Sequence, residues 1–205
     1  EGMYAAIGIH PEDAQKSPDL DVDLVTLEGL IAERERHKIV ALGEIGFDYY
    51  WQPVDKDVQS KAFSEQMKLA QRYDLPVVIH DREAHGDSLA IIREFPNVKG
   101  VFHCYSGSVE MAKELVKLGW MLSFTGVLTY KNARKTVEVA EAIPLDRIVV
   151  ETDSPYLSPV PMRGKRNDSR NIPYILGKLA EIRGISVAEA EAITCQNGKK
   201  LFGID

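Results

Sequence analysis

Cysteine is nearly absent from this sequence. Cys104 and Cys195 are its two cysteines in 205 residues, too few for a disulfide framework, and we expect a protein of the reducing cytoplasm. Long apolar runs are absent as well, because no stretch is long enough to cross a membrane and the start has no signal-peptide pattern. Together these absences predict a cytoplasmic protein without a membrane segment.

An excess of basic residues is also missing. Lysine and arginine number 25 against 31 acidic residues, which gives a net charge of −6. This balance argues against a surface that coats nucleic acid through general positive charge. It is compatible with an enzyme that handles phosphates through metal ions and a few local basic groups. Because the composition shows no break along the chain, we predict a single domain, residues 1–205, with a sizeable core.

Neither a G-x-G-x-x-G loop nor a Walker-type loop is present, although such loops open many nucleotide-binding sheets. What is present is a regular alternation of apolar strand-like runs and stretches with helical spacing, which predicts a parallel sheet covered by helices. The predicted strands are residues 4–9, 39–46, 75–80, 98–104, 120–127 and 147–153. The predicted helices are residues 20–36, 57–73, 87–95, 109–118, 132–143, 172–183 and 187–194.

Two architectures fit this alternation. A doubly wound open sheet would accommodate the predicted strands, but its ligands gather at one crevice, whereas candidate site residues here follow many strands. A barrel draws its site from the ends of many strands, and a complete one needs eight strands and roughly 250 residues. We therefore predict an α/β fold, a TIM-type (β/α) barrel with about six of eight strands present. The barrel is incomplete at the N-terminus, because the C-terminus closes with helices.

Four side chains that commonly bind metal ions stand at the ends of predicted strands: Glu44, His80, His103 and Asp153. Each has an ordinary structural explanation, as a loop cap, a hydrogen-bonded histidine or a turn-making aspartate. As a set they indicate a metal site, because neighbouring parallel strands lie about 4.8 Å apart and their ends can reach a common ion. Imidazole with carboxylate suits zinc, manganese and other divalent metals, so the identity of the ion stays open.

Asp153 is the leading catalytic candidate. It follows the run 148–150, which is typical of a buried parallel strand, and the carboxyl ends of such strands carry the active sites of α/β barrels. Asp153 would bind one ion and accept a proton from its water, whose pKa the metal lowers to near 7. Cys104 directly follows His103 and would point the opposite way in a strand, so we interpret it as a packing residue.

Three further features could contact a substrate, and each keeps a second explanation. His10 lies at a predicted strand end but also begins a loop. Residues 163–167 are the one basic cluster of the chain and follow the Asp153 strand, where barrels bind phosphate, although a solvated face explains them equally well. The run Tyr49-Tyr50-Trp51 could stack a base or sugar, or pack against a neighbouring loop.

Six motifs occur in the order GIHP, GEIGFDYY, VVIHDREA, FHCYSG, ETDSPYL and RGKRN. In this order they resemble the motifs of the TatD family of metal-dependent nucleases, which belongs to the amidohydrolase-like TIM-barrel group. The resemblance runs from about Tyr4 to the C-terminal helices. It implies hydrolysis of phosphodiester bonds, with DNA as the usual substrate.

The resemblance also implies a role for each matching residue. Glu44 would be the acid shared by two divalent metal ions, and His80 and His103 would be ligands of one of them. Asp153 would bind the other ion and assist the attacking water, so that Asp153 and Glu44 are the expected catalytic pair.

On the substrate side, the resemblance places Arg166 and Asn167 in a loop where contact with a phosphate is expected. With His10, they are the predicted substrate-binding residues. The implied partner is a nucleic acid, with DNA expected, and magnesium, manganese and zinc are not distinguished as the metal.

The sequence departs from the family at one point. TatD-like proteins carry a His-x-His pair on their first strand, and this sequence contains no such pair. The missing pair falls within the strand–helix units that the barrel lacks, so the chain resembles a family member without its N-terminal portion. One predicted ion keeps His80 and His103, while the other keeps Asp153 and a share of Glu44. A barrel without two strands would expose unpaired edges, which favours self-association.

Two alternatives to the nuclease therefore stay open. The first keeps the barrel and the metal but cleaves small amides, esters or lactones, since the same metal–water chemistry serves those bonds. The second is an inactive truncated barrel that acts only in binding or self-association.

Overall fold

The computed structural model describes residues 2–204, and the chain divides into two compact units, Glu1–Phe102 and His103–Asp205. The single domain expected over residues 1–205 stays a prediction. Among the described residues, no helix is both long enough and apolar enough to pass through a membrane.

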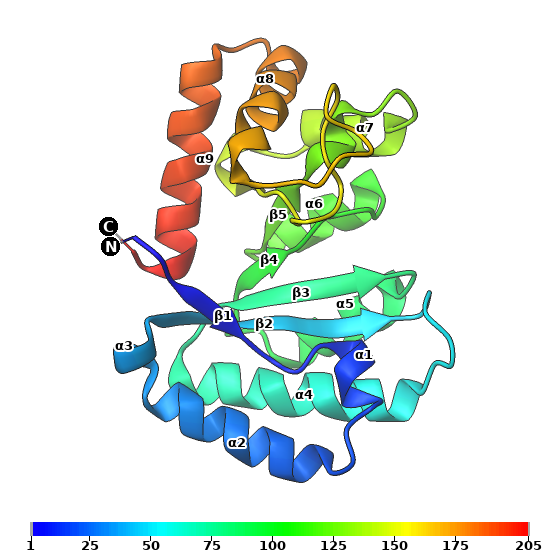
Figure 1. Cartoon of the computed structure of the whole chain (residues 1–205), viewed down its shortest axis with the longest axis vertical. Helices are drawn as coiled ribbons and strands as arrows, with labels where there is room; N and C mark the ends of the chain where they lie inside the picture. The colour runs from blue at the N-terminus through cyan, green and yellow to red at the C-terminus, as the bar shows by residue number, and fades with distance from the viewer. Residues whose placement is uncertain (1, 205) are drawn as a thin grey trace. The chain divides into compact units, whose positions relative to one another are not determined.

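The first unit is a parallel sheet with helices packed on it (Figure 1). Its strands are β1 (Ala5–Ile7), β2 (Ile39–Asp48), β3 (Val77–Arg82) and β4 (Gly100–Phe102), and neighbours in the order β1-β2-β3-β4 are parallel. Its helices are α1 (Pro11–Ala14), α2 (Leu20–Ala32), α3 (Arg34–His37), α4 (Lys56–Tyr73) and α5 (His85–Glu94). The long helix α4 packs on β2, and α2 lies beside α4 (Figure 1).

Strand β2 pairs with β1 on one side and with β3 on the other, and it is buried along most of its length. Its sequence, IVALGEIGFD, is buried at nearly every position, as expected for a parallel strand covered on both faces. Helix α4 contributes Phe63 and Met67 to the core, and both side chains are fully buried. The helix begins at Asp55, whose side chain accepts a hydrogen bond from the backbone N–H of Val58. The packing of α4 therefore fixes the strand that carries Glu44.

Two glycines allow β2 to approach β3 closely around Glu44. A Cβ atom at Gly46, where φ is +140°, would lie 2.0 Å from the backbone oxygen of His80, and one at Gly43 would meet β3 at 2.5 Å. The register of the two strands shifts between Gly43 and Ile45. Such irregularities re-aim a side chain, and here the side chain is the carboxylate of Glu44.

The second unit contains a pair of parallel strands, β5 (Met121–Phe124) and β6 (Ile148–Val150). Its α-helices are α6 (Val109–Lys117), α7 (Arg134–Ala142), α8 (Ile172–Arg183) and α9 (Val187–Phe202), with short 3-10 turns η1 (Gly126–Thr129), η2 (Leu145–Arg147) and η3 (Ser169–Asn171). Helix α9 is fastened beside β6 by Asn197, whose amide donates to the backbone oxygens of Leu145 (2.9 Å) and Ile148 (2.7 Å). This contact supports the strand that leads to Asp153.

The predicted α/β class is confirmed, and the described residues contain six strands. Most predicted ends lie within two residues of the observed ones, but four elements differ by more. The expected strand 120–127 is shorter, since β5 ends at Phe124. The expected helix 20–36 is two helices, α2 and α3, and the expected helix 187–194 extends as α9 to Phe202. The expected strand 147–153 ends at Val150, so Asp153 lies in the loop that follows, with φ at 55°.

Candidate metal and substrate site

The first unit brings three candidate metal ligands together. Ligand atoms of His10, Glu44 and His80 all lie within 4.8 Å of one another, and each residue is half-buried. His10 follows β1, Glu44 lies within β2 and His80 lies near the end of β3, so three neighbouring strands supply one candidate metal ligand each. Imidazole and carboxylate donors in this arrangement fit a divalent transition-metal ion.

The ring of His80 is held by two carboxylates. Its Nε2 lies 2.9 Å from Oδ2 of Asp48, whose side chain is 1% exposed, and its Nδ1 lies 3.5 Å from Oε2 of Glu44. Burial lowers the pKa of His80, but hydrogen bonds to Glu44 and Asp48 outweigh it and hold the pKa above its usual value. A carboxylate on one ring nitrogen fixes the orientation of the ring and makes the other nitrogen a better ligand.

Asp48 is a site residue that the sequence predictions did not include. Burial raises the pKa of Asp48, but hydrogen bonds from His80 and from the backbone N–H groups of Trp51 and Tyr50 lower it below its usual value. The sequence carries a signal for it, since Asp48 and Glu44 are the two acids of a strand whose remaining residues are apolar or glycine. What the sequence could not show is that His80 is its partner.

His10 was predicted to contact substrate, and the structure places it against His80, with ring centroids 4.4 Å apart. Its Nδ1 accepts a hydrogen bond from the backbone N–H of Glu12 at 3.3 Å, which caps α1. Because Nδ1 accepts this hydrogen bond, neutral His10 carries its proton on Nε2, and Nε2 is a hydrogen-bond donor. Burial, and then the nearby His80, lower the pKa of His10, which favours this neutral form.

The second unit contains another histidine between carboxylates. Nδ1 of His103 lies 2.6 Å from Oε2 of Glu151, and its Nε2 lies 3.7 Å from Oδ1 of Asp153. The other oxygen of Glu151 accepts a hydrogen bond from the backbone N–H of Cys104 at 2.8 Å. Burial raises the pKa of Glu151, but the hydrogen bond and charge of His103, together with hydrogen bonds from Ser123 and the Cys104 backbone, outweigh it and lower the pKa. An ionised Glu151 therefore holds the His103 proton on Nδ1 and turns Nε2 toward Asp153.

Glu151 was not predicted as a site residue, although it lies within the same ETD motif as Asp153. Two residues beside this pair have left-handed backbones: Cys104 at φ 43° and Asp153 at φ 55°. Aspartate tolerates this conformation better than most residues, and strained backbone is common at functional sites. Cys104 was interpreted as packing, and its Sγ lies 3.5 Å from the hydroxyl of Thr125.

The two predicted phosphate contacts of the second unit differ in exposure. Arg166 is exposed. Asn167 is buried, and its amide donates to the backbone oxygens of Thr152 (2.8 Å) and Tyr156 (2.7 Å). Its side-chain oxygen accepts from Asp168 and Asn171. Because these bonds use the whole amide, Asn167 shapes the loop beyond β6, and direct contact with a substrate is left to its exposed neighbour.

His80 and His103 belong to different units, so their predicted sharing of one ion stays a prediction. Within each unit the arrangement is the same: a histidine is oriented by one carboxylate and faces a second one. Such side chains on the parallel strands of an α/β fold are typical of one class of protein, the metal-dependent hydrolases.

Comparison with known proteins gives the particular family. Residues 1–203 match the family described as "TatD related DNase". The chain is 42% identical to the uncharacterized metal-dependent hydrolase YabD of Bacillus subtilis, over 99% of this chain and 78% of YabD. It is 40% identical to the uncharacterized metal-dependent hydrolase YcfH of Escherichia coli K12, over 100% of this chain and 76% of YcfH. The chain belongs to the TatD family.

Solved structures agree. YJJV, a TatD homolog from Escherichia coli K12, superposes with a TM-score of 0.91 at 33% identity, over 98% of this chain and 77% of that one. A phosphotriesterase homology protein from Escherichia coli, at 16% identity and a TM-score of 0.67 over 97% of this chain and 74% of that one, shows the shared fold alone. The predicted TIM-barrel, amidohydrolase-like fold and the metal-dependent hydrolase class are confirmed.

Proposed function

We propose that this protein hydrolyses phosphodiester bonds of DNA with a metal-activated water. The observation that carries the proposal is the group His10, Glu44 and His80, whose ligand atoms lie within 4.8 Å of one another on three neighbouring strands of a TatD-family chain. The carboxylate of Glu44 and the imidazole of His80 match the ligands that divalent metal ions take from proteins, and His10 lies against them with Nε2 as a hydrogen-bond donor.

Each unit would contribute its own donors. In the first unit, Glu44 and Nδ1 of His80 would hold an ion, because Nε2 of His80 is engaged by Asp48. In the second unit, Nε2 of His103 and the carboxylate of Asp153 face each other and would do the same. A bound divalent ion would supply Lewis-acid chemistry, lowering the pKa of a coordinated water and neutralising charge on a phosphoryl oxygen.

The remaining steps belong to side chains of this chain. Asp153 would accept the proton of the attacking water at its carboxylate. Glu151 would keep Nε2 of His103 unprotonated by holding the proton on Nδ1. The exposed guanidinium of Arg166 would contact a phosphate of the substrate, on a loop that Asn167 holds in shape.

Two observations support DNA as the substrate. The matching family is described by a DNase activity. The exposed residues Arg163, Lys165 and Arg166 follow β6 in a chain whose overall charge is −6, so they concentrate positive charge locally. Local basic groups bind the phosphates of a nucleic-acid backbone, whereas a small neutral amide, ester or lactone carries no negative charge for them to bind.

The test is cleavage of end-labelled single-stranded DNA by the chelator-treated chain after addition of Mg²⁺, Mn²⁺ or Zn²⁺. Asp153→Asn should lower the cleavage rate at least ~100-fold, because it removes the proton acceptor and a ligand. Asp146→Asn is the matched control, since Asp146 is an exposed acid of the same unit, and it should leave the rate unchanged. Metal-dependent turnover of esters or amides without DNA cleavage would instead establish the small-molecule alternative.

A further inference from the structure

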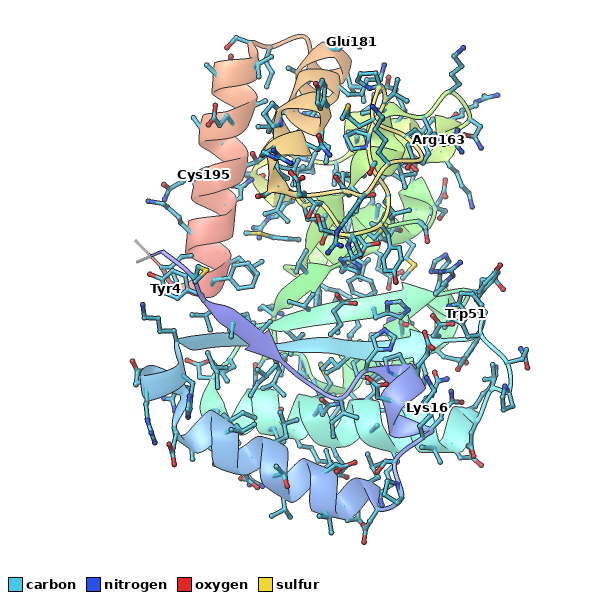
Figure 2. All side chains as sticks on the ribbon, in the orientation of Figure 1. Tyr4, Lys16, Trp51, Arg163, Glu181 and Cys195 are labelled. Atoms are coloured by element: carbon cyan, nitrogen blue, oxygen red, sulfur yellow. The ribbon has the colours of Figure 1, made fainter. Side chains whose placement is uncertain are left out.

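The loop after β2 carries exposed aromatic side chains that the metal chemistry does not use. Trp51 is 53% exposed and Tyr50 is 47% exposed. Figure 2 shows Trp51 beyond the carboxyl ends of β2 and β3. Tyr49 is different, because its hydroxyl donates to Asp87 at 2.6 Å and its ring lies under Lys56. Tyr49 therefore serves the fold, and the other two aromatic rings remain available at the surface.

An arginine from the neighbouring strand joins these two rings. Cζ of Arg82, the last residue of β3, lies 4.0 Å from the centroid of the Tyr50 ring and 5.9 Å from that of Trp51. The two rings meet edge to face, with centroids 4.9 Å apart. Among the described residues, Arg82 makes no ion pair, so its charge is not neutralised there. The result is an exposed surface of flat π-systems beside a positive charge.

This surface is fixed to the candidate metal site by a single carboxylate. Oδ1 of Asp48 accepts hydrogen bonds from the backbone N–H groups of Tyr50 (2.9 Å) and Trp51 (3.1 Å). Its other oxygen, Oδ2, lies 2.9 Å from Nε2 of His80. The buried Asp48 therefore sets the position of the aromatic loop relative to a candidate ligand. Preorganisation of this kind lowers the entropic cost of binding.

We propose that Tyr50, Trp51 and Arg82 form a subsite that stacks a base of single-stranded nucleic acid, an inference that rests on the proposed function. A base would stack on the exposed Trp51 ring, and Arg82 would contact the adjacent phosphate. A paired base hides its faces in the helix stack, so the subsite selects single strands or frayed ends. Since every base has a π-face, it favours bases over bare backbone without choosing among them.

Tryptophan fluorescence can test this subsite directly. The chain has two tryptophans, and Trp120 is 1% exposed, so a surface ligand reports through Trp51. We would titrate the full chain with oligothymidylate and with an abasic oligonucleotide of equal length, both in chelator so that no cleavage occurs. We expect oligothymidylate to quench the emission and to bind roughly 5- to 150-fold more tightly than the abasic strand.

Substitutions identify the ring responsible, with binding followed by anisotropy of a labelled strand. Trp51→Ala should lower the ratio of the affinity for oligothymidylate to that for the abasic strand to about one. Trp51→Phe should keep most of this preference because a stacking ring remains. Tyr174→Ala is the matched control, since Tyr174 is an exposed aromatic residue of α8, 44% exposed, and it should keep the full preference. Equal affinity of the wild-type chain for both strands, or a preference that survives Trp51→Ala, would overturn the subsite.

Cleavage with added Mn²⁺ separates this inference from the proposed function. Cleavage of both oligonucleotides without a binding preference would refute the proposed subsite but would still support the hydrolytic function. A preference that depends on Trp51, without cleavage of either strand, would support the subsite and count against the hydrolytic function.

Discussion

At the scale of single residues, the main feature of the candidate site is two histidines, each in contact with a carboxylate. His80 pairs with Asp48 at 2.9 Å, and His103 pairs with Glu151 at 2.6 Å. Both histidines stand out in the sequence because they follow apolar strands. Their partners also stand at the ends of apolar strands, but they lie 32 and 48 residues away along the chain and meet the histidines only in the folded protein. Strand position could be predicted, but side-chain pairing could not.

Asp48→Asn tests the role of this pairing. The substitution keeps the size of the side chain but replaces a charged acceptor by an amide, which weakens the orientation of the His80 ring. We expect metal affinity to fall by about 10- to 100-fold, as for other residues that hold a metal-binding histidine. Isothermal titration with Mn²⁺ or Zn²⁺ measures it.

Asp57→Asn is the control for this substitution, since Asp57 is an exposed acid in the first turn of α4. Its metal affinity should equal that of the wild-type chain. Binding by Asp48→Asn within twofold of the wild type would show that Asp48 does not orient a ligand.

At the scale of elements, the β2–β3 pair determines where the donors lie. The glycines on either side of Glu44 let the two strands approach, and the change in register between Gly43 and Ile45 redirects the Glu44 side chain. The GEIG sequence indicates a place where the backbone bends or approaches another group. Which group it approaches is decided by pairing with β3, because the contact is with the backbone of His80.

Gly46→Ala tests this close approach. The added methyl group would lie 2.0 Å from the His80 backbone oxygen at a φ of +140°, so the strands must separate. We expect a loss of more than about 3 kcal/mol in the free energy of unfolding, measured by urea denaturation.

Gly29→Ala provides the contrast within the same unit. Gly29 lies in the interior of α2, and a Cβ there meets nothing within 4 Å. The substitution should raise stability by about 0.5–1 kcal/mol, since alanine has the higher helix propensity. Equal effects at the two glycines would contradict the importance of the β2–β3 contact.

At the scale of the whole molecule, each compact unit carries its own candidate metal ligands, with Glu44 and His80 in the first and His103 and Asp153 in the second. An ion that binds only the folded chain stabilises it in proportion to its occupancy. Metal binding can therefore be detected through stability, independently of any activity.

Thermal unfolding of the chelator-treated chain, before and after addition of Mn²⁺ or Zn²⁺, measures this stabilisation. An ion at about 100 times its dissociation constant should add about 2.7 kcal/mol and raise the midpoint by about 5–10 °C. His80→Ala should lose the part of this shift that the first unit supplies. His37→Ala should keep it, because His37 is a solvated residue whose side chain is 41% exposed. An identical shift in both variants would exclude His80 as a ligand.

The sequence alone determined the α/β alternation and the family, and it singled out Glu44, His80, His103 and Asp153 as candidate metal ligands. These features depend on local periodicity and on motif order, which a linear chain carries in full. Only the tertiary structure decided the partners of these donors: Asp48 for His80, Glu151 for His103, and His10 beside Glu44. It also decided that the amide of Asn167 makes all its hydrogen bonds to neighbouring residues of its own loop, and that the Arg82 guanidinium lies over the Tyr50 ring. Such contacts join residues distant in the chain, and their existence depends on strand register and backbone turns that no local pattern records.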